Sequence, residues 1–533
     1  MKKRSTACFI LVLALAMATV GCGGTPEKAA PPATKPPAET VLKIGWYAKV
    51  DSMDPQIHTS RFLAMIDSNL HDPLIWEVEP YKFAPGLAEK WEVNKEMTEI
   101  VLYLKKDIKL TDGTPFTADI LVSNWNRMLD PKTAALRKGV FENIKEFKKV
   151  DDYTLKVTFT NVMPRILNHF TGNWTSPSSP KAQAALGTEY QIQPVGYGPY
   201  KFDSRPDENT VILAKNKDYK PPAHLRAPYY DKIIIKVVPE DPSRMVALQN
   251  GDVDLIFRPP NIEVAALAKD PKYTLAYFKT PGLPQGYMPN VTTFPTNEKN
   301  VRLALIYALD RDEISKLAWF GTAAGASSAL ASTSWAFWQE SKNEYKYNPE
   351  KAKQLLEEAG WKVNPATGIR MKNGKPLKVR FVVTAGKDHE VAVTRWRAVG
   401  FDVVFEVMAY EATAKRMADN EYEISRLGLS ATDPDVLWGA FHSSQILGGA
   451  QFNRTRIADQ KLDQLLDQGR QTADFEKRKA IYLELQKYIM GNGWWIPSYE
   501  DQYIWAVSSK FSPMEFSLGG NPIFQQFKPA AAK

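Results

Sequence analysis

Residue types that commonly carry chemistry occur in this 533-residue chain without the spacing that catalysis requires. Residues 196–200 hold two glycines of a nucleotide-binding loop, but the third is missing and Pro199 removes an N–H that would hold a phosphate. Residues 368–375 approach the pattern of a phosphate loop, yet their glycines lie one residue too far apart. The Ser-x-x-Lys spacing at Ser178 lacks the other two elements of penicillin-recognising enzymes. We therefore expect no catalytic residues.

Metal-binding patterns are also missing from the sequence. No two of the six histidines have the i, i+4 spacing that places two ligands on one helix face. Cys8 and Cys22 are the only cysteines and both lie near the amino terminus, so the body of the chain has no disulfide and no Cys metal site. We expect no built-in metal site and no cofactor.

The first 21 residues have the pattern of a secretory signal, in which three cations precede an apolar stretch and small residues. Crossing a bilayer takes about 20 apolar residues, more than this stretch offers. Residues 19–22, Thr-Val-Gly-Cys, resemble a bacterial lipobox with Thr in place of the usual Leu, so we expect Cys22 to be lipidated. An ordinary secreted protein cut nearby is the alternative. Residues 22–40 are rich in Pro and Ala and predict an extended tether.

Length and charge limit the kinds of protein that remain possible. About 490 residues follow the tether, too many for one hydrophobic core and suitable for two or three lobes. The net charge of +8 includes three leader cations, which leaves 8 − 3 = +5 without the clustered basic stripe of a nucleic-acid binder. We expect no nucleic-acid partner. The 14 Trp and 22 Tyr are suited to lining a small-molecule cleft, although most will pack in cores.

Apolar periodicity predicts alternating strands and helices through the rest of the chain. Strands are predicted at residues 41–48, 100–104, 154–159, 231–238, 377–384 and 402–407, with a turn into another strand at 251–257. Helices are predicted at 61–70, 117–129, 242–250, 348–359 and within 459–489. Asn348 and Pro349 have the types expected at a helix start, and Gly360 the type expected after its end. The pattern predicts α/β lobes.

A series of short motifs extends over nearly all of the chain after the tether. They lie at residues 87–93, 112–119, 196–200, 247–254, 301–302, 308–311, 352–361 and 433–435. In this order they resemble the family 5 extracellular solute-binding proteins of bacterial ABC importers for peptides, nickel and related solutes. The motifs also have plain structural interpretations: we expect a turn at 196–200, and local capping or pairing by Arg302 and Asp310.

The resemblance implies an α/β, two-lobed, periplasmic-binding-protein-like fold of type II, cluster C, with an extra subdomain in the first lobe. Residues 41–283 plus 495–533 would form lobe I and residues 284–494 lobe II, with a solute enclosed between them. By motif position, the chain would cross between the lobes near residues 282–290 and again near 494–499. Lobe closure would exclude water from the ligand.

The resemblance also implies a cleft-edge segment at residues 54–61, where Thr59, Ser60 and Arg61 would face the solute. Small residues are common at the position of Arg61, and a guanidinium there could grip a carboxylate or phosphate through two hydrogen bonds. A solvated cation at the start of a helix is the alternative interpretation.

Family members that bind peptides hold the ligand's amino terminus with an Asp of the second lobe. Ser430 occupies that position here, so the carboxylate is missing in register, unless a gapped alignment lets Asp433 serve. Lys387 falls where the family's carboxylate-binding Arg stands, in a shorter segment, and solvent exposure is the alternative. Trp438 and His442 follow the Asp-Pro step and would wall the cleft, with Trp438 in a lobe core as the alternative.

The sequence thus predicts a non-enzymatic, monomeric lipoprotein held outside the cytoplasm on the cell membrane. It would capture a peptide or peptide-like anion or zwitterion and pass it to the permease subunits of an ABC importer. An oligosaccharide, a metal chelate or another organic solute is an alternative ligand. An extracytoplasmic hydrolase is the alternative from another class of protein.

Overall fold

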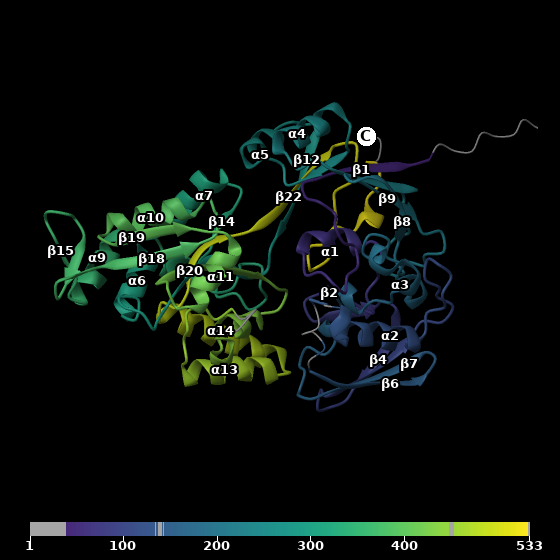
Figure 1. The fold of residues 1–533 in the computed structure, drawn as a ribbon, viewed down its shortest axis with the longest axis horizontal. Coiled ribbons are helices and arrows are strands. Elements are labelled where there is room, and N and C mark those ends of the chain that lie inside the picture. The colour runs from purple at the N-terminus through teal and green to yellow at the C-terminus, as the bar shows by residue number, and fades with distance from the viewer. Residues whose placement is uncertain (1–38, 134, 137–140, 142, 447–451, 531–533) are drawn as a thin grey trace, which may run out of the picture. The chain divides into compact units, whose positions relative to one another are not determined.

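The computed structural model describes residues 39–133, 135–136, 141, 143–446 and 452–530 (Figure 1). The predicted signal, Cys22 and nearly all of the predicted tether lie outside the described residues, so these predictions stay predictions. The elements below belong to the compact unit formed by residues 40–533. None of the helices in the described ranges has the length and apolar character needed to cross a membrane.

A seven-stranded mixed sheet organises one core. Its strands, in spatial order, are β12 (Tyr273–Lys279), β22 (Gln502–Ser508), β11 (Leu255–Phe257), β1 (Val41–Trp46), β10 (Lys232–Val237), β9 (Thr210–Lys215) and β8 (Tyr200–Asp207). β1 runs parallel to both β10 and β11, whereas the other pairs are antiparallel. Helix α1 (Arg61–Asp67) packs Leu63, Met65 and Ile66 into this core, which fixes the helix against the sheet. α4 (Asp241–Asn250) and α5 (Asn261–Leu267) belong to the same part of the chain.

Residues between β1 and β8 form a second, smaller core. An antiparallel sheet contains β4 (Ala88–Val93), β5 (Glu99–Leu104), β7 (Thr154–Phe159) and β6 (Ile144–Asp151) in that order. α2 (Ala118–Leu129) buries Trp125 and Leu121 against it. The hairpin of β2 (Ile75–Glu79) and β3 (Lys82–Pro85) and the short α3 (Pro180–Leu186) complete this region.

A six-stranded sheet organises the third core. Its order is β14 (Ala324–Gly325), β21 (Ile496–Glu500), β13 (Gly282–Pro289), β20 (Ile424–Ser430), β18 (Lys378–Val383) and β19 (Asp402–Val407). The helices of this part are α6 (Lys299–Tyr307), α7 (Arg311–Trp319), α8 (Ser341–Glu344), α9 (Pro349–Glu358), α10 (His389–Ala398), α11 (Tyr410–Ala418), α12 (Val436–Phe441), α13 (Gln460–Gln471) and α14 (Phe475–Gly491). A small sheet of β15 (Lys362–Val363), β16 (Arg370–Lys372) and β17 (Lys375–Pro376) follows α9.

The chain passes between the two large sheets at two places, which Figure 1 shows as the teal β12 region and the yellow path into β22. β12 ends at Lys279 and β13 of the other sheet begins at Gly282. β21 ends at Glu500 and β22 begins at Gln502. The two connections are joined by a hydrogen bond in which the Thr280 amide donates to the Asp501 carbonyl oxygen at 3.0 Å.

Most predicted elements are confirmed, with bounds that differ by a few residues at the ends. Asn348 caps α9 by accepting the Lys351 amide at 2.9 Å, as its type predicts. The two residues expected to cap or pair locally do so. Asp310 caps α7, and Arg302 donates to the backbone carbonyl oxygens of the nearby residues 296 and 297 and also to that of residue 492. Buried carbonyl groups, and not a carboxylate, satisfy this guanidinium.

Candidate ligand-binding site

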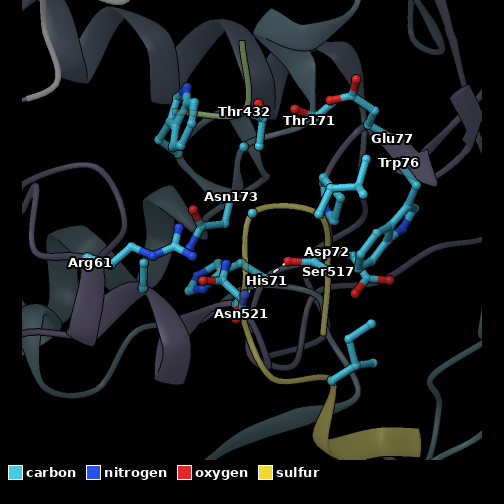
Figure 2. A pocket seen from close by; sticks show the side chains of 18 of the residues that line it. Arg61, His71, Asp72, Trp76, Glu77, Thr171, Asn173, Thr432, Ser517 and Asn521 are labelled. Atoms are coloured by element: carbon cyan, nitrogen blue, oxygen red, sulfur yellow. Dashed lines mark hydrogen bonds between the residues drawn. The ribbon is translucent and has the colours of Figure 1, made fainter. Parts of the chain in front are cut away.

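A cavity of about 560 Å³ lies where segments of all parts of the fold meet (Figure 2). Its walls come from α1 and the residues that follow it, from the start of β2, from residues 171–174 and from the end of β20. The loop at residues 517–525, near the end of the chain, closes another side. Pockets that hold small molecules commonly have volumes of about 300–1,000 Å³, so this cavity has the size of a ligand site.

Arg61 enters the cavity from the first position of α1. Ser60 caps this helix, its hydroxyl accepting the Leu63 amide at 3.3 Å, so the backbone that carries Arg61 is held in place. The guanidinium carbon lies 6.0 Å from the Phe278 ring centre and 5.8 Å from that of Tyr503. Within the described chain, its buried Nε and Nη2 atoms have no hydrogen-bond partner. Burial lowers the pKa of Arg61, and Tyr503 acts in the opposite direction.

A glycine turn lets the carboxyl-terminal loop pass directly over this guanidinium. Gly520 has φ +80°, and a Cβ there would lie 2.2 Å from a ring carbon of Phe278 and 2.6 Å from Nη2 of Arg61. A larger residue would therefore displace either the loop or the arginine. The close approach removes water from one side of Arg61, which strengthens any charge interaction that a ligand makes there.

Two carboxylates face the same cavity. Asp72 is buried, and its Oδ2 accepts the Tyr219 hydroxyl at 2.8 Å. Glu77 accepts the Tyr81 amide at 3.0 Å and the Asn168 side-chain amide at 2.6 Å. Burial raises the pKa of Asp72 to about 7 and also raises that of Glu77. In the part of the chain that the structure describes, neither carboxylate has a Lys or Arg nitrogen at ion-pair distance.

Other polar groups of the lining have unused hydrogen-bonding capacity. Several buried atoms of the lining make no hydrogen bond to any described residue, among them Nε1 of Trp76, Oδ1 of Asn521 and Nε2 of Gln525. Figure 2 shows Arg61 on one side of the cavity and Trp76 and Glu77 on the opposite side. Buried polar atoms are nearly always bonded in folded proteins, so such a concentration of unpaired ones indicates that a ligand or water completes them.

The turn at residues 196–200 holds the acidic side of the cavity in position. The Asp72 amide donates to the Tyr197 carbonyl oxygen at 2.6 Å, and the Tyr200 amide donates to that of Asn69 at 3.0 Å. A Cβ on Gly198 would lie 2.5 Å from the carbonyl carbon of Leu70. The glycine is therefore required by close backbone contact, and the motif serves as a turn that positions lining residues.

Asp433 lies in a cluster of its own, in which its carboxylate is fully engaged. Arg478 contacts it through two nitrogens at 2.7 and 2.8 Å, and Nε of Arg165 lies at 2.9 Å. The Asp435 amide donates to the same carboxylate at 2.8 Å, and the Tyr81 hydroxyl at 3.3 Å. Burial alone would raise the pKa of Asp433, but Arg165 and Arg478 outweigh it and hold the pKa below its usual value. Little capacity remains for a ligand's ammonium group.

Other residues predicted from the sequence lie in different places. Thr59 and Ser430 line the rim of the cavity together with Arg61, whereas Ser60 serves as the helix cap. Lys387 is exposed and lines a separate cavity of about 300 Å³. Trp438 and His442 lie outside the walls of the cavity described here.

Trp438 and His442 contact each other and polar side chains near them in the fold. Trp438 donates its indole N–H to Asp467 at 3.1 Å and stacks on the ring of His442 at 4.8 Å. Nδ1 of His442 lies 2.7 Å from the Ser444 hydroxyl. The Trp438 contact with Asp467 joins α12 to α13, and both side chains have structural partners.

Several lining residues were missed by the sequence analysis. They are Asp72, Trp76, Glu77, Asn521 and Gln525. The adjacent glycines Gly519 and Gly520 are a local signal of a turn in the final loop, because paired glycines mark close turns. Nothing local indicates that this loop meets residues more than 440 positions earlier in the chain.

Comparisons with known proteins agree on one family. A family model described as bacterial extracellular solute-binding proteins, family 5 Middle, matches residues 82–446. Glutathione-binding protein GsiB of Escherichia coli is 25% identical over 482 residues, covering 89% of this chain and 91% of that protein. Heme-binding protein A of Haemophilus influenzae is 28% identical over 448 residues, covering 78% of each.

Solved structures show the same fold at lower sequence identity. NikA from Brucella suis in complex with Fe(III)-EDTA superposes with a TM-score of 0.81 at 20% identity, covering 92% of this chain and all of the other. HbpA2 from Haemophilus parasuis superposes with a TM-score of 0.80 at 21% identity, with the same coverage.

Proposed function

Because the chain belongs to family 5 of the bacterial extracellular solute-binding proteins, which serve ABC importers, we propose that it captures a peptide-like anion or zwitterion in the cavity beside Arg61. The fold is the mixed α/β fold of these binding proteins. The solute would then pass to the membrane permease. The similar proteins named above are binding proteins of transport systems, in keeping with a role in capture and not in catalysis.

The buried guanidinium of Arg61 is the observation that carries this proposal. An arginine binds a carboxylate or phosphate through two parallel hydrogen bonds, and such bonds are stronger when water is excluded. Two nitrogens of Arg61 have no hydrogen-bond partner in the described residues, and the residue lines the cavity. Glutathione, heme and EDTA, named for three of the similar proteins, are all carboxylate-bearing compounds.

In this proposal each of the two large sheets forms the centre of one lobe. Lobe I would contain the seven-stranded sheet and, as its extra subdomain, the four-stranded sheet, and lobe II the six-stranded sheet. The connections at residues 280–281 and at Asp501 would serve as the hinge. Ligand bound between the lobes adds stability to the closed form, by roughly 2.7 kcal/mol at 100 times its dissociation constant.

Native mass spectrometry of the protein purified from its extracytoplasmic fraction tests the proposal. We expect a bound solute that is released by denaturation, carries an acidic group and rebinds to the stripped protein with a rise in Tm. Arg61→Met should lose the solute, whereas Arg226→Met, at an exposed ion pair with Glu515, should retain it. Retention of the same solute by Arg61→Met would contradict the proposal.

Anchoring through Cys22 is a separate part of the proposal, supported by the lipobox-like context of this residue. A single acyl chain binds membranes only marginally, whereas two or more hold a protein stably. The wild type should therefore fractionate with membranes in the native host, and Cys22→Ser should be released. Equal solubility of the two proteins would contradict the lipid anchor.

A further inference from the structure

We infer, on the basis of the proposed function, that the ligand is dipolar: it presents an anionic group to Arg61 and a cationic group to Asp72 and Glu77 across the same cavity (Figure 2). The amine of the solute would be read by these first-lobe carboxylates, and neither Ser430 nor Asp433 would take part. This assigns the cationic group to a place that the family resemblance does not indicate.

The charges around the cavity are unbalanced in a way that a dipolar molecule would complete. Arg61 lies against the rings of Phe278 and Tyr503. The hydrogen bonds that Asp72 and Glu77 accept come from neutral donors. Against the larger effect of burial, Lys105 and Arg165 lower the pKa of Asp72 and Glu77, respectively, through their charge, but the described residues show no ion pair between them. Removing a charge from water without a partner costs several kcal/mol in a protein. A ligand that supplies both counter-charges recovers this cost on both sides at once.

Each carboxylate retains acceptor positions for a ligand. An ionised carboxylate has about four lone-pair sites. The bonds described for Asp72 use one oxygen, through the Tyr219 hydroxyl, and those for Glu77 use each oxygen once. An ammonium, with three donors, could bridge the remaining positions without breaking any of these hydrogen bonds.

Trp76 adds a surface suited to a cation. It belongs to β2, between the two acidic residues in sequence, and lines the cavity with them. Its ring makes an edge contact with His224, with ring centres 5.5 Å apart. A tryptophan face attracts ammonium and guanidinium groups, more strongly when water is excluded.

The carboxylate of Asp433 can be compared with those of Asp72 and Glu77 in the same protein. The second-lobe carboxylate that could have taken a ligand amine already contacts Arg478 and Arg165. Two guanidinium groups of the protein therefore occupy the place of a ligand cation there. Lys105 and Arg165 act on the cavity carboxylates through their charge without an ion pair among the described residues, so Asp72 and Glu77 keep more capacity for a ligand cation than Asp433 does.

Binding of end-blocked peptides tests the inference. The probes are three mixtures of tripeptides with alanine at both ends and all side chains at the centre: one with free ends, one amino-acetylated and one carboxyl-amidated. Stripped protein is titrated with each mixture by calorimetry, and bound species are identified by native mass spectrometry. We expect the free mixture to bind at least tenfold more tightly than either blocked mixture, because each block removes one charge pair.

Variants assign each preference to one side of the cavity. Glu77→Gln should abolish the preference for a free amine while retaining that for a free carboxylate, and Arg61→Met should do the reverse. Glu79→Gln is the matched control, because Glu79 lies on the same strand but is exposed and pairs with Lys82. Its preferences should equal those of the wild type.

Three results would overturn the inference. They are equal binding of free and acetylated mixtures by the wild type, an amine preference that survives in both Glu77→Gln and Asp72→Asn, and failure of the free mixture to bind. In each case, rebinding of the solute carried from the cell would leave the proposed function standing. Loss of that rebinding as well would contradict the proposed function itself.

Discussion

Arg478 is fully buried and Arg61 is partly buried, with Nε and Nη2 removed from water, and the two arginines differ in what surrounds them. The Arg478 side chain is 0% exposed and forms a two-point ion pair with Asp433, whose side chain is 3% exposed. Arg61 lies against the rings of Phe278 and Tyr503, with no carboxylate at ion-pair distance among the described residues. A buried charge that the protein pairs internally is part of the structure. One that it leaves unpaired beside a cavity is available to a ligand.

The paired cluster also joins two parts of the fold. Tyr81 belongs to the β2–β3 turn and Arg165 follows β7, whereas Asp433 and Arg478 lie around α12 and α14. Tyr81 stacks edge-on with Trp335 at 5.5 Å and contacts Arg478. The cluster therefore joins the region of the four-stranded sheet to the region of the six-stranded sheet, which identifies it as a structural contact.

Breaking the paired cluster should have the largest effect on stability. Arg478→Met leaves the Asp433 carboxylate buried with one guanidinium fewer, and removing one partner of a buried ion pair costs about 3–5 kcal/mol. Urea unfolding at neutral pH measures this change. Lys415→Met, at an exposed ion pair with Asp419, is the control and should change stability little. Equal effects of the two substitutions would show that the cluster is not structural.

Disturbing the turn at residues 196–200, which positions Asp72, should have the next largest effect on stability. Gly198→Ala places a Cβ about where Leu70 and His71 backbone atoms lie, and such overpacking costs about 1–3 kcal/mol. Solute affinity should fall as well, because the turn positions Asp72. Gly439→Ala, on α12, is the control, since its Cβ would meet no atom within 4 Å. The measurement is thermal unfolding of both variants, and a neutral Gly198→Ala would contradict the positioning role of the turn.

The protonation of Asp72 should produce a smaller effect that depends on pH. Its pKa is raised by burial to about 7, well above the value of about 3.9 for an unfolded chain. Between these two values the folded protein binds more protons than the unfolded one, so this contribution to stability is complete below about pH 4 and is lost as pH rises from about 4 through 7. Between pH 6 and 8 the wild type should lose about 1 kcal/mol relative to Asp72→Asn. Parallel pH profiles of Tm for the two proteins would contradict the shift.

The sequence predicted the elements whose patterns are local. β7 and β19 have the predicted bounds, and Asn348 and Pro349 start α9 as their types require. Of the predicted site residues, Thr59, Arg61 and Ser430 line the cavity. These three were chosen from their positions in local motifs alone.

The rest of the site depends on long-range contacts that have no local pattern. The final loop reaches Arg61 through Gly520, some 460 positions away, and Asp433 meets Arg478 and Arg165 from distant parts of the chain. Whether a carboxylate is free for a ligand depends on these partners. For that reason the sequence left the role of Asp433 open, and did not single out Asp72 and Glu77.

Thermal unfolding of Arg61→Met, with and without the solute released from the purified wild type, tests the central claim most directly. Without solute, we expect the Tm of the variant to equal or exceed that of the wild type, because the substitution removes a buried charge that has no ionic partner in the described structure. With solute, the wild type should gain stability and the variant should gain almost none. A variant destabilised as strongly as Arg478→Met, yet still stabilised by the solute, would show that Arg61 is a structural residue and contradict the account.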